Sequence, residues 1–281
     1  MRRRSPFAIG AVLVGVLIAG CGQATYTAAG SSVSATSSTP APAVVNVASC
    51  PVPAADYAGT PYSPQAAPAT TTLPASVTLP GNAQIFGTTF LAGSTSYLLA
   101  QKSGACQAGL SSADGGENMT AATVPGEGVT VTISPGGAGP STDLACPYIP
   151  AVHAADEAFR RGTASCTHPS ADVIRQIPTH TAGLYAAAVL VPAQVKDPGI
   201  QGSGNGTDPT VALFTASASA DAAAGQAIAC TLVPAQGNIC AASLRFFLAT
   251  QAQIRTRMSA ANLSAMQDAL SSFLAEQHVS G

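Results

Sequence analysis

Four histidines are the residues of this sequence best suited to general acid–base chemistry, because an unperturbed imidazole titrates close to neutral pH. Two of them, His168 and His180, flank Asp172 in the segment between Cys166 and Gly183. A serine hydrolase needs a histidine beside both an acidic residue and a nucleophilic serine. His168 or His180 is therefore the candidate general base if this chain is a secreted hydrolase.

Other catalytic signatures are absent from the sequence. There is no G-x-S-x-G, H-E-x-x-H, S-x-x-K or phosphate-binding P-loop motif. The cysteines and histidines also lack the C-x₂-C and H-x₃-H spacings that are typical of zinc sites. The sequence therefore predicts no catalytic residue, no metal and no cofactor, and the hydrolase remains the alternative hypothesis.

The first 21 residues have the organisation of an export signal. Arg2, Arg3 and Arg4 precede an uncharged apolar run from Phe7 to Ala19, which is shorter than the roughly 20 residues of a membrane span. The run ends in the sequence Leu17-Ile18-Ala19-Gly20-Cys21, which resembles the lipobox of bacterial lipoproteins. The resemblance implies cleavage after Gly20 and attachment of acyl chains to Cys21.

Composition sets limits on the partners of the mature chain. Removal of residues 1–20 leaves eight basic residues against thirteen acidic ones, which gives a net charge of −5. This balance argues against a nucleic-acid partner, since nucleic-acid binding requires a basic face. Residues 21–48 are rich in Ser, Thr, Ala and Pro, and we expect them to form a disordered tether.

Six cysteines remain beyond Cys21, and an even number in an exported chain favours three disulfides. Cys230 and Cys240 lie symmetrically about a turn-forming tetrad, so we expect them to face each other across a hairpin. Cys146 and Cys166 flank a short helical segment and are the next expected pair, which would leave Cys50 with Cys106. Six cysteines allow fifteen connectivities, and the sequence does not decide among them. If Cys50 is bridged, the proline-rich segment 60–80 becomes an extended strap across the domain.

Strand patterns dominate the rest of the chain. Short runs rich in Thr, Val, Ile and aromatic residues alternate with Gly, Asp and Ser clusters. From residue 184 onward the runs predict a meander, although 239–258 also fits a helical stripe and we prefer a strand followed by a helix. The predicted strands are 84–90, 96–101, 119–124, 128–134, 184–193, 210–217, 226–233 and 239–250.

Two helices are predicted with identifiable ends. The first runs from Pro150 to Gly162, and the second starts at Ser259 as its N-cap and carries an apolar stripe that includes Leu270 and Phe273. The resulting fold class is α+β: an antiparallel meander packed by a C-terminal helix and held by disulfides. The domain spans 49–281, with a possible β-rich part at 81–145 and an α+β part at 146–281.

These patterns favour a membrane-anchored, extracytoplasmic lipoprotein whose domain binds an envelope protein or a small apolar ligand. Alternatives are a hydrolase that uses His168 or His180, and an envelope sensor or coat protein that has no ligand. The sequence does not decide between them, because aromatic residues make up only 5% of the chain and no binding motif stands out.

Overall fold

Two β-sheets and a layer of helices make up the described part of the chain. The computed structural model describes residues 43–52, 66–90, 95–110, 116–124, 127–134, 144–159, 166, 168–197, 199–200, 203, 207–218, 223–231 and 233–279. The strands are β1 (Ala43–Ser49), β2 (Thr70–Leu73), β3 (Ala83–Thr89), β4 (Thr95–Gln101), β5 (Ala105–Leu110), β6 (Glu117–Val124), β7 (Glu127–Ser134), β8 (Val173–Gln176), β9 (Leu184–Val191), β10 (Thr210–Ala218) and β11 (Ala223–Thr231). The helices are α2 (Pro150–Phe159), the 3₁₀ turn η1 (Pro234–Gln236), α3 (Gly237–Thr250), α4 (Ala252–Arg257) and α5 (Ala260–Glu276).

The larger sheet is antiparallel and has seven strands in the order β5-β6-β7-β11-β10-β9-β8. It consists of two meanders, β5 to β7 and β8 to β11, which join where β7 pairs with β11. Alternation along β7 gives the sheet two different faces, because Val129 and Val131 point to the main core while Thr130 and Thr132 lie on the opposite face. We call these the inner face and the outer face.

The smaller sheet has the order β2-β1-β3-β4. Strand β1 pairs antiparallel with β2 through its first residues and parallel with β3 through its last ones. Because β1 occupies 43–49, the tether predicted for 21–48 is wrong over its last six residues. Residues 21–42 lie outside the described part of the chain, as does the signal peptide predicted for 1–20.

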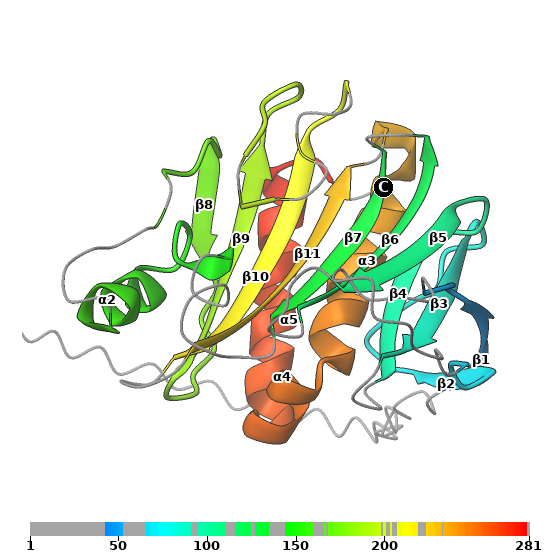
Figure 1. Cartoon of the computed structure of the whole chain (residues 1–281), viewed down its shortest axis with the longest axis horizontal. Helices are drawn as coiled ribbons and strands as arrows, with labels where there is room; N and C mark the ends of the chain where they lie inside the picture. The colour runs from blue at the N-terminus through cyan, green and yellow to red at the C-terminus, as the bar shows by residue number, and fades with distance from the viewer. Residues whose placement is uncertain are drawn as a thin grey trace, which may run out of the picture. The chain divides into compact units, whose positions relative to one another are not determined.

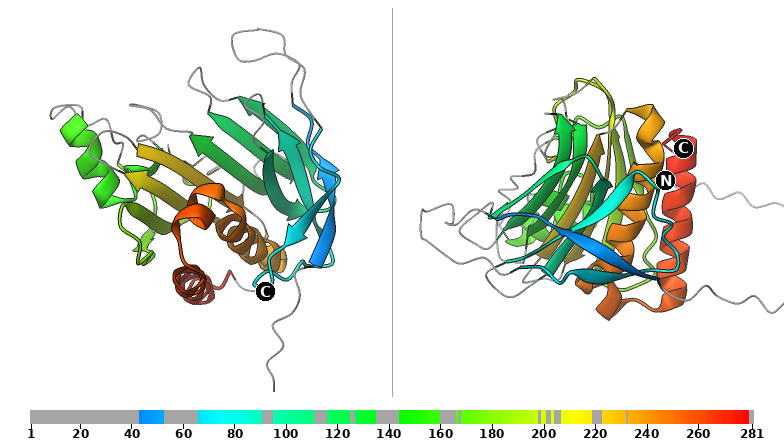
Figure 2. Two further views of the ribbon diagram at one scale, coloured as in Figure 1. Left: turned by 90° about the horizontal axis from the view of Figure 1, so that it is seen from below. Right: turned by 90° about the vertical axis from the view of Figure 1, so that its right-hand side faces the viewer.

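Helices α3, α4 and α5 lie on the inner face of the seven-stranded sheet, while α2 lies at the opposite face (Figures 1 and 2). The predicted N-cap of α5 is confirmed, since the Ser259 hydroxyl accepts a hydrogen bond from the Asn262 backbone N–H. The apolar stripe of α5 is buried through Met266, Leu270 and Phe273, among others. A C-terminal helix that packs on an antiparallel sheet is therefore the observed arrangement.

The strand predicted for 239–250 is wrong, because this segment is helix α3. Its apolar run is too continuous to distinguish a buried strand from a buried helix by periodicity. Eleven of its fourteen residues are buried, since α3 packs against β4, β10 and β11 and also against α5. A helix with protein on nearly every side needs no polar face.

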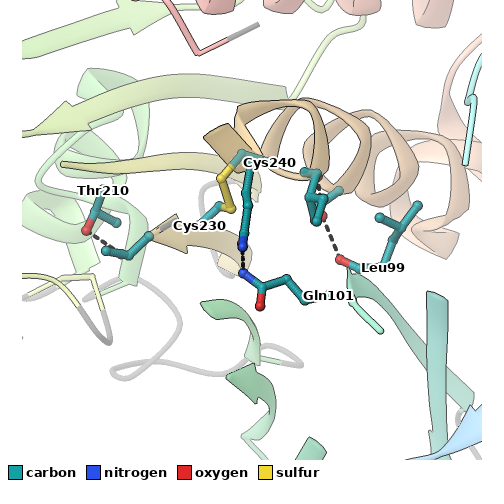
Figure 3. Close-up of a disulfide and its surroundings, with 9 residues drawn as sticks. Leu99, Gln101, Thr210, Cys230 and Cys240 are labelled. Atoms are coloured by element: carbon teal, nitrogen blue, oxygen red, sulfur yellow. Dashed lines mark hydrogen bonds between the residues drawn. A yellow bond between two sulfur atoms is a disulfide. The ribbon is translucent and has the colours of Figure 1, made fainter. Parts of the chain in front are cut away.

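Three disulfides join the cysteine pairs that the spacing favoured, Cys50–Cys106, Cys146–Cys166 and Cys230–Cys240. The geometry expected for the last pair is wrong, because Cys240 lies on α3 and not on a hairpin strand (Figure 3). The Cys50–Cys106 bridge joins the end of β1 to β5, and the Ala108 N–H donates to the Pro51 carbonyl beside it.

Strands on both sides of residue 145 belong to the same sheet, so the possible division into 81–145 and 146–281 is not observed. The chain from Thr39 to Gly281 forms one unit. Of the strap predicted for 60–80, residues 60–65 lie outside the described part of the chain and Thr70–Leu73 form β2. After β2, Val77 is buried and the Gln267 side chain of α5 donates to the Ser76 hydroxyl. None of the described helices is long and apolar enough to span a membrane.

We predict that the Cys50–Cys106 bridge stabilises the fold more than Cys230–Cys240 does. The bridges enclose sequence separations of 56 and 10 residues, so removal of each by double Cys→Ser substitution should cost about 4 and about 3 kcal/mol respectively. Urea unfolding of the two variants under identical conditions measures the difference. A larger loss of stability on removal of Cys230–Cys240 than on removal of Cys50–Cys106 would contradict the idea that the bridges stabilise the fold by restricting the unfolded chain.

Candidate functional site

The histidines proposed for catalysis are not part of a catalytic arrangement in the described structure. His168 and His180 are both exposed, and within the described residues neither ring forms a hydrogen bond with a Ser, Cys or Asp side chain. The backbone of His180 has a positive φ of 50°, and its carbonyl accepts a 2.9 Å hydrogen bond from the Asn262 side chain. His180 therefore belongs to a turn that attaches the β8–β9 loop to α5.

The other predicted site residues are the cysteines. Cys21 lies outside the described residues, and the remaining six form the disulfides described above. No group of His, Cys, Asp or Glu side chains in the described ranges is arranged to hold a metal ion.

A buried carboxylate on the outer face is the chemically most unusual group of the described structure. Asp197 is only 1% exposed, yet its carboxylate accepts hydrogen bonds from the Tyr148 hydroxyl, the Ser170 N–H (2.7 Å) and the Gly199 N–H (3.0 Å). Burial of an ionised group is tolerated when such donors replace its hydration. Asp197 thus fixes three separate segments of the chain to one another.

Tyr148 connects this carboxylate to the sheet. Its ring stacks on Phe214 of β10 with a centroid separation of 4.1 Å and an interplanar angle of 20°. Its carbonyl accepts a 2.7 Å hydrogen bond from the Gln176 side chain on β8. Burial raises the pKa of the Tyr148 phenol well above its usual range, and the hydrogen bond to Asp197 and the charge of that carboxylate raise it further.

The loop after Asp197 is held close to Tyr148. A Cβ atom at Gly199 would lie 2.5 Å from the Tyr148 hydroxyl oxygen, so only glycine allows the backbone to come this close to the Tyr148 ring. The Ser203 hydroxyl accepts from the Asp197 N–H and donates to the Ile200 carbonyl, each at 2.8 Å. These contacts give Gly199 and Ile200 a fixed position over the outer face.

A small depression opens between this loop and the sheet. It has an empty volume of about 200 Å³, which includes space that is open to solvent. The floor combines small apolar residues of β11 with hydroxyl-bearing residues of β7. The lining residues are Thr130, Thr132, Gly199, Ile200, Phe214, Ala227 and Ala229.

Register places the polar and apolar lining residues directly opposite each other. Thr130 pairs with Ala229 and Thr132 pairs with Ala227 across the β7–β11 ladder. The hydroxyl oxygen of Thr130 also lies 3.1 Å from that of Thr120 on β6, so the hydroxyl row continues onto the next strand. None of the lining residues carries a charge, and none pairs a nucleophile with a base.

Sequence reasoning missed this site, although weak signals were present. Asp197 precedes Pro198-Gly199 in a glycine-rich loop, which is a turn pattern. The strict alternation Val129-Thr130-Val131-Thr132-Ile133 predicted one threonine face, and that face is now seen to line the depression. No sequence pattern indicated that Tyr148 and Asp197 would meet.

Comparisons with protein-family models, with curated proteins and with solved structures gave no match for this chain.

We predict that Tyr148 makes the stability of the fold sensitive to alkaline pH. A pKa that is raised on folding contributes stability that is complete below the unfolded pKa, about 10 for tyrosine, and that is lost as the pH rises beyond it. Urea unfolding between pH 8 and pH 11 should show a steeper decline for the wild type than for Tyr148→Phe.

The Tyr148→Phe variant should also be less stable at neutral pH by about 1–3 kcal/mol, because it removes one donor from a buried carboxylate. Tyr97→Phe, at a half-buried tyrosine of the smaller sheet, is the control for loss of a tyrosine hydroxyl. Equal pH slopes for the wild type and Tyr148→Phe would show that the buried pair has no such role.

Proposed function

We propose that this chain is a lipoprotein of the bacterial cell membrane, anchored through acylated Cys21 on the extracytoplasmic side, and that its α+β domain binds a ligand without chemical conversion. The lipobox-like sequence Leu17 to Cys21 supports the anchor. The outer-face depression is the candidate binding site.

The three disulfides are the observation that carries the extracytoplasmic location. Each of the six cysteines beyond Cys21 is paired, and two of the bridges are nearly free of solvent contact. Disulfides form and persist in oxidising compartments and are rare in the bacterial cytosol. The domain therefore matches a chain that is exported by the signal at residues 1–20.

The composition of the candidate site supports binding over catalysis. Its lining consists of two threonines, two alanines, one phenylalanine, Gly199 and Ile200, and the nearby Asp197 carboxylate already accepts hydrogen bonds from three donors. The hydrolase alternative requires His168 or His180 as a base, and no observation favours it, because both side chains are exposed and apart from any acid–nucleophile pair in the described ranges.

The anchor is tested by expression of the full chain in bacteria that are fed radiolabelled palmitate. The wild type should incorporate label and sediment with the membrane, whereas Cys21→Ser should lose the label, because the serine hydroxyl cannot form the thioether. Thr25→Ala, four residues after Cys21, is the control and should behave like the wild type. Label that persists in Cys21→Ser would refute lipidation at this position.

A further inference from the structure

We propose that the Cys146–Cys166 disulfide is a redox switch that fastens the outer flap, which we define as residues 150–159, 166 and 168–171, to the outer face of the larger sheet. A dithiol of the oxidoreductase class in the cell envelope opens this bridge, and the freed flap loosens the loop that carries Gly199 and Ile200. The inference rests on the proposed function, because these two residues line the candidate site that the switch would regulate.

Exposure to solvent separates this bridge from the other two. The four cysteines of the Cys50–Cys106 and Cys230–Cys240 bridges are each at most 8% exposed, and Cys146 is 2% exposed. Cys166 is half-buried, which makes it the one bridged cysteine of the described residues that is not buried. A disulfide opens by attack of a thiolate on one of its sulfur atoms, and exposed disulfides are the labile ones. The Sγ atom of Cys166 is therefore the point of attack.

The exchange reaction balances without any group beyond the dithiol. The first thiolate of the reductant attacks Sγ of Cys166, forms a mixed disulfide and displaces Cys146 as a thiolate. The second thiolate of the reductant then attacks its own sulfur in the mixed disulfide and displaces Cys166. Two electrons pass to the protein, the reductant becomes a disulfide, and the protons lost by its two thiols are taken up by the cysteine thiolates. Oxidation in the same compartment closes the bridge again.

Apart from the bridge, the flap has few buried contacts. Val152 is the only buried residue among the described side chains of α2, whereas eleven of the fourteen residues of α3 are buried. Cys166 and Ala171 pack only partly against the outer cluster. Segments with few buried contacts open locally at a small fraction of the global free energy of unfolding. Opening of the bridge should thus release the flap while the sheet beneath it stays folded.

One hydrogen bond connects the flap to the candidate site. The Ser170 N–H, four residues after Cys166, donates to Oδ2 of Asp197 at 2.7 Å. A buried carboxylate that loses a donor is unfavourable until water replaces it. Release of Ser170 should therefore loosen the loop around Asp197, whose other carboxylate oxygen accepts the Gly199 N–H.

The order in which the bridges open is the first test. The full chain is incubated with dithiothreitol, quenched with acid, unfolded and alkylated, and peptide mass spectrometry then reports each cysteine separately. We expect Cys146 and Cys166 to become alkylated roughly tenfold faster than the cysteines of the other two bridges. Earlier opening of Cys50–Cys106 or Cys230–Cys240, or simultaneous opening of all three, would overturn the switch.

Hydrogen exchange of the chain in which only Cys146–Cys166 is reduced is the second test. Amides of the flap and of the segment around Gly199 should exchange about tenfold faster than in the oxidised chain, because both segments open locally. Amides of α5 on the inner face should be unchanged. The double variant Cys146→Ser/Cys166→Ser is the matched control, which should exchange like the reduced chain and be insensitive to dithiothreitol. If this variant fails to fold, the reduced and oxidised wild type still decide.

The outcomes separate this inference from the proposed function. Unchanged exchange in the flap, or acceleration in α5 as strong as in the flap, would show that the bridge controls no local opening and would overturn the proposal. Faster exchange of the flap alone, with no change around Gly199, would overturn its connection to the candidate site. Neither measurement uses a ligand or the lipid anchor, so failure of the switch leaves the proposed binding function and the palmitate experiment unaffected.

Discussion

The fold depends on a helix that has almost no contact with solvent. Helix α3 lies between the two sheets and is joined to each by a different interaction (Figure 3). The Cys230–Cys240 disulfide attaches it to β11 of the larger sheet, while the Ser243 hydroxyl donates to the Leu99 carbonyl of β4 in the smaller sheet at 2.6 Å. The Gln101 side chain also donates to Gln236 at the start of the helix. Together with the direct packing of β4 against β6 and β7 and the Cys50–Cys106 bridge, these contacts with α3 make the two sheets one packed unit.

Burial on the inner face has a consequence for the outer face. Since α3, α5 and the smaller sheet cover only the inner side, the outer side has its own, smaller cluster, which contains many alanines and is covered by the 144–152 segment and the loop after Val195. That cover is fastened by the Cys146–Cys166 bridge and by the hydrogen bonds of Asp197. Gly199 and Ile200 of this loop form one wall of the depression. Threonines of β7 and alanines of β11 form its floor. The same carboxylate that holds the cover therefore also fixes one wall of the candidate site.

Local patterns were reliable where one face of an element is buried and the other is not. The strands near 84–90, 96–101 and 128–134 are found within one or two residues, as is the Ser259 cap of α5. Patterns failed where an element is buried on nearly all sides, as in α3, or is short and at an edge of the sheet, as in β5 and β8. In the buried helix no polar face reveals the helical repeat of 3.6 residues. In the edge strands, strand formation depends more on pairing with the neighbouring strand than on the intrinsic preference of their own residues.

The sequence by itself predicted the antiparallel strands and the capped C-terminal helix, and its cysteine spacing favoured the three pairs that the structure shows, because each of these follows from residues that are close together or from a spacing. The export-type N-terminus stays a prediction. Only the tertiary structure decided which strands are neighbours, that Cys240 belongs to a helix, and that Tyr148 and Asp197 meet over Phe214. Those contacts join residues from different parts of the chain. Their free energy comes from burial and from hydrogen bonds formed only after packing, which no local pattern records.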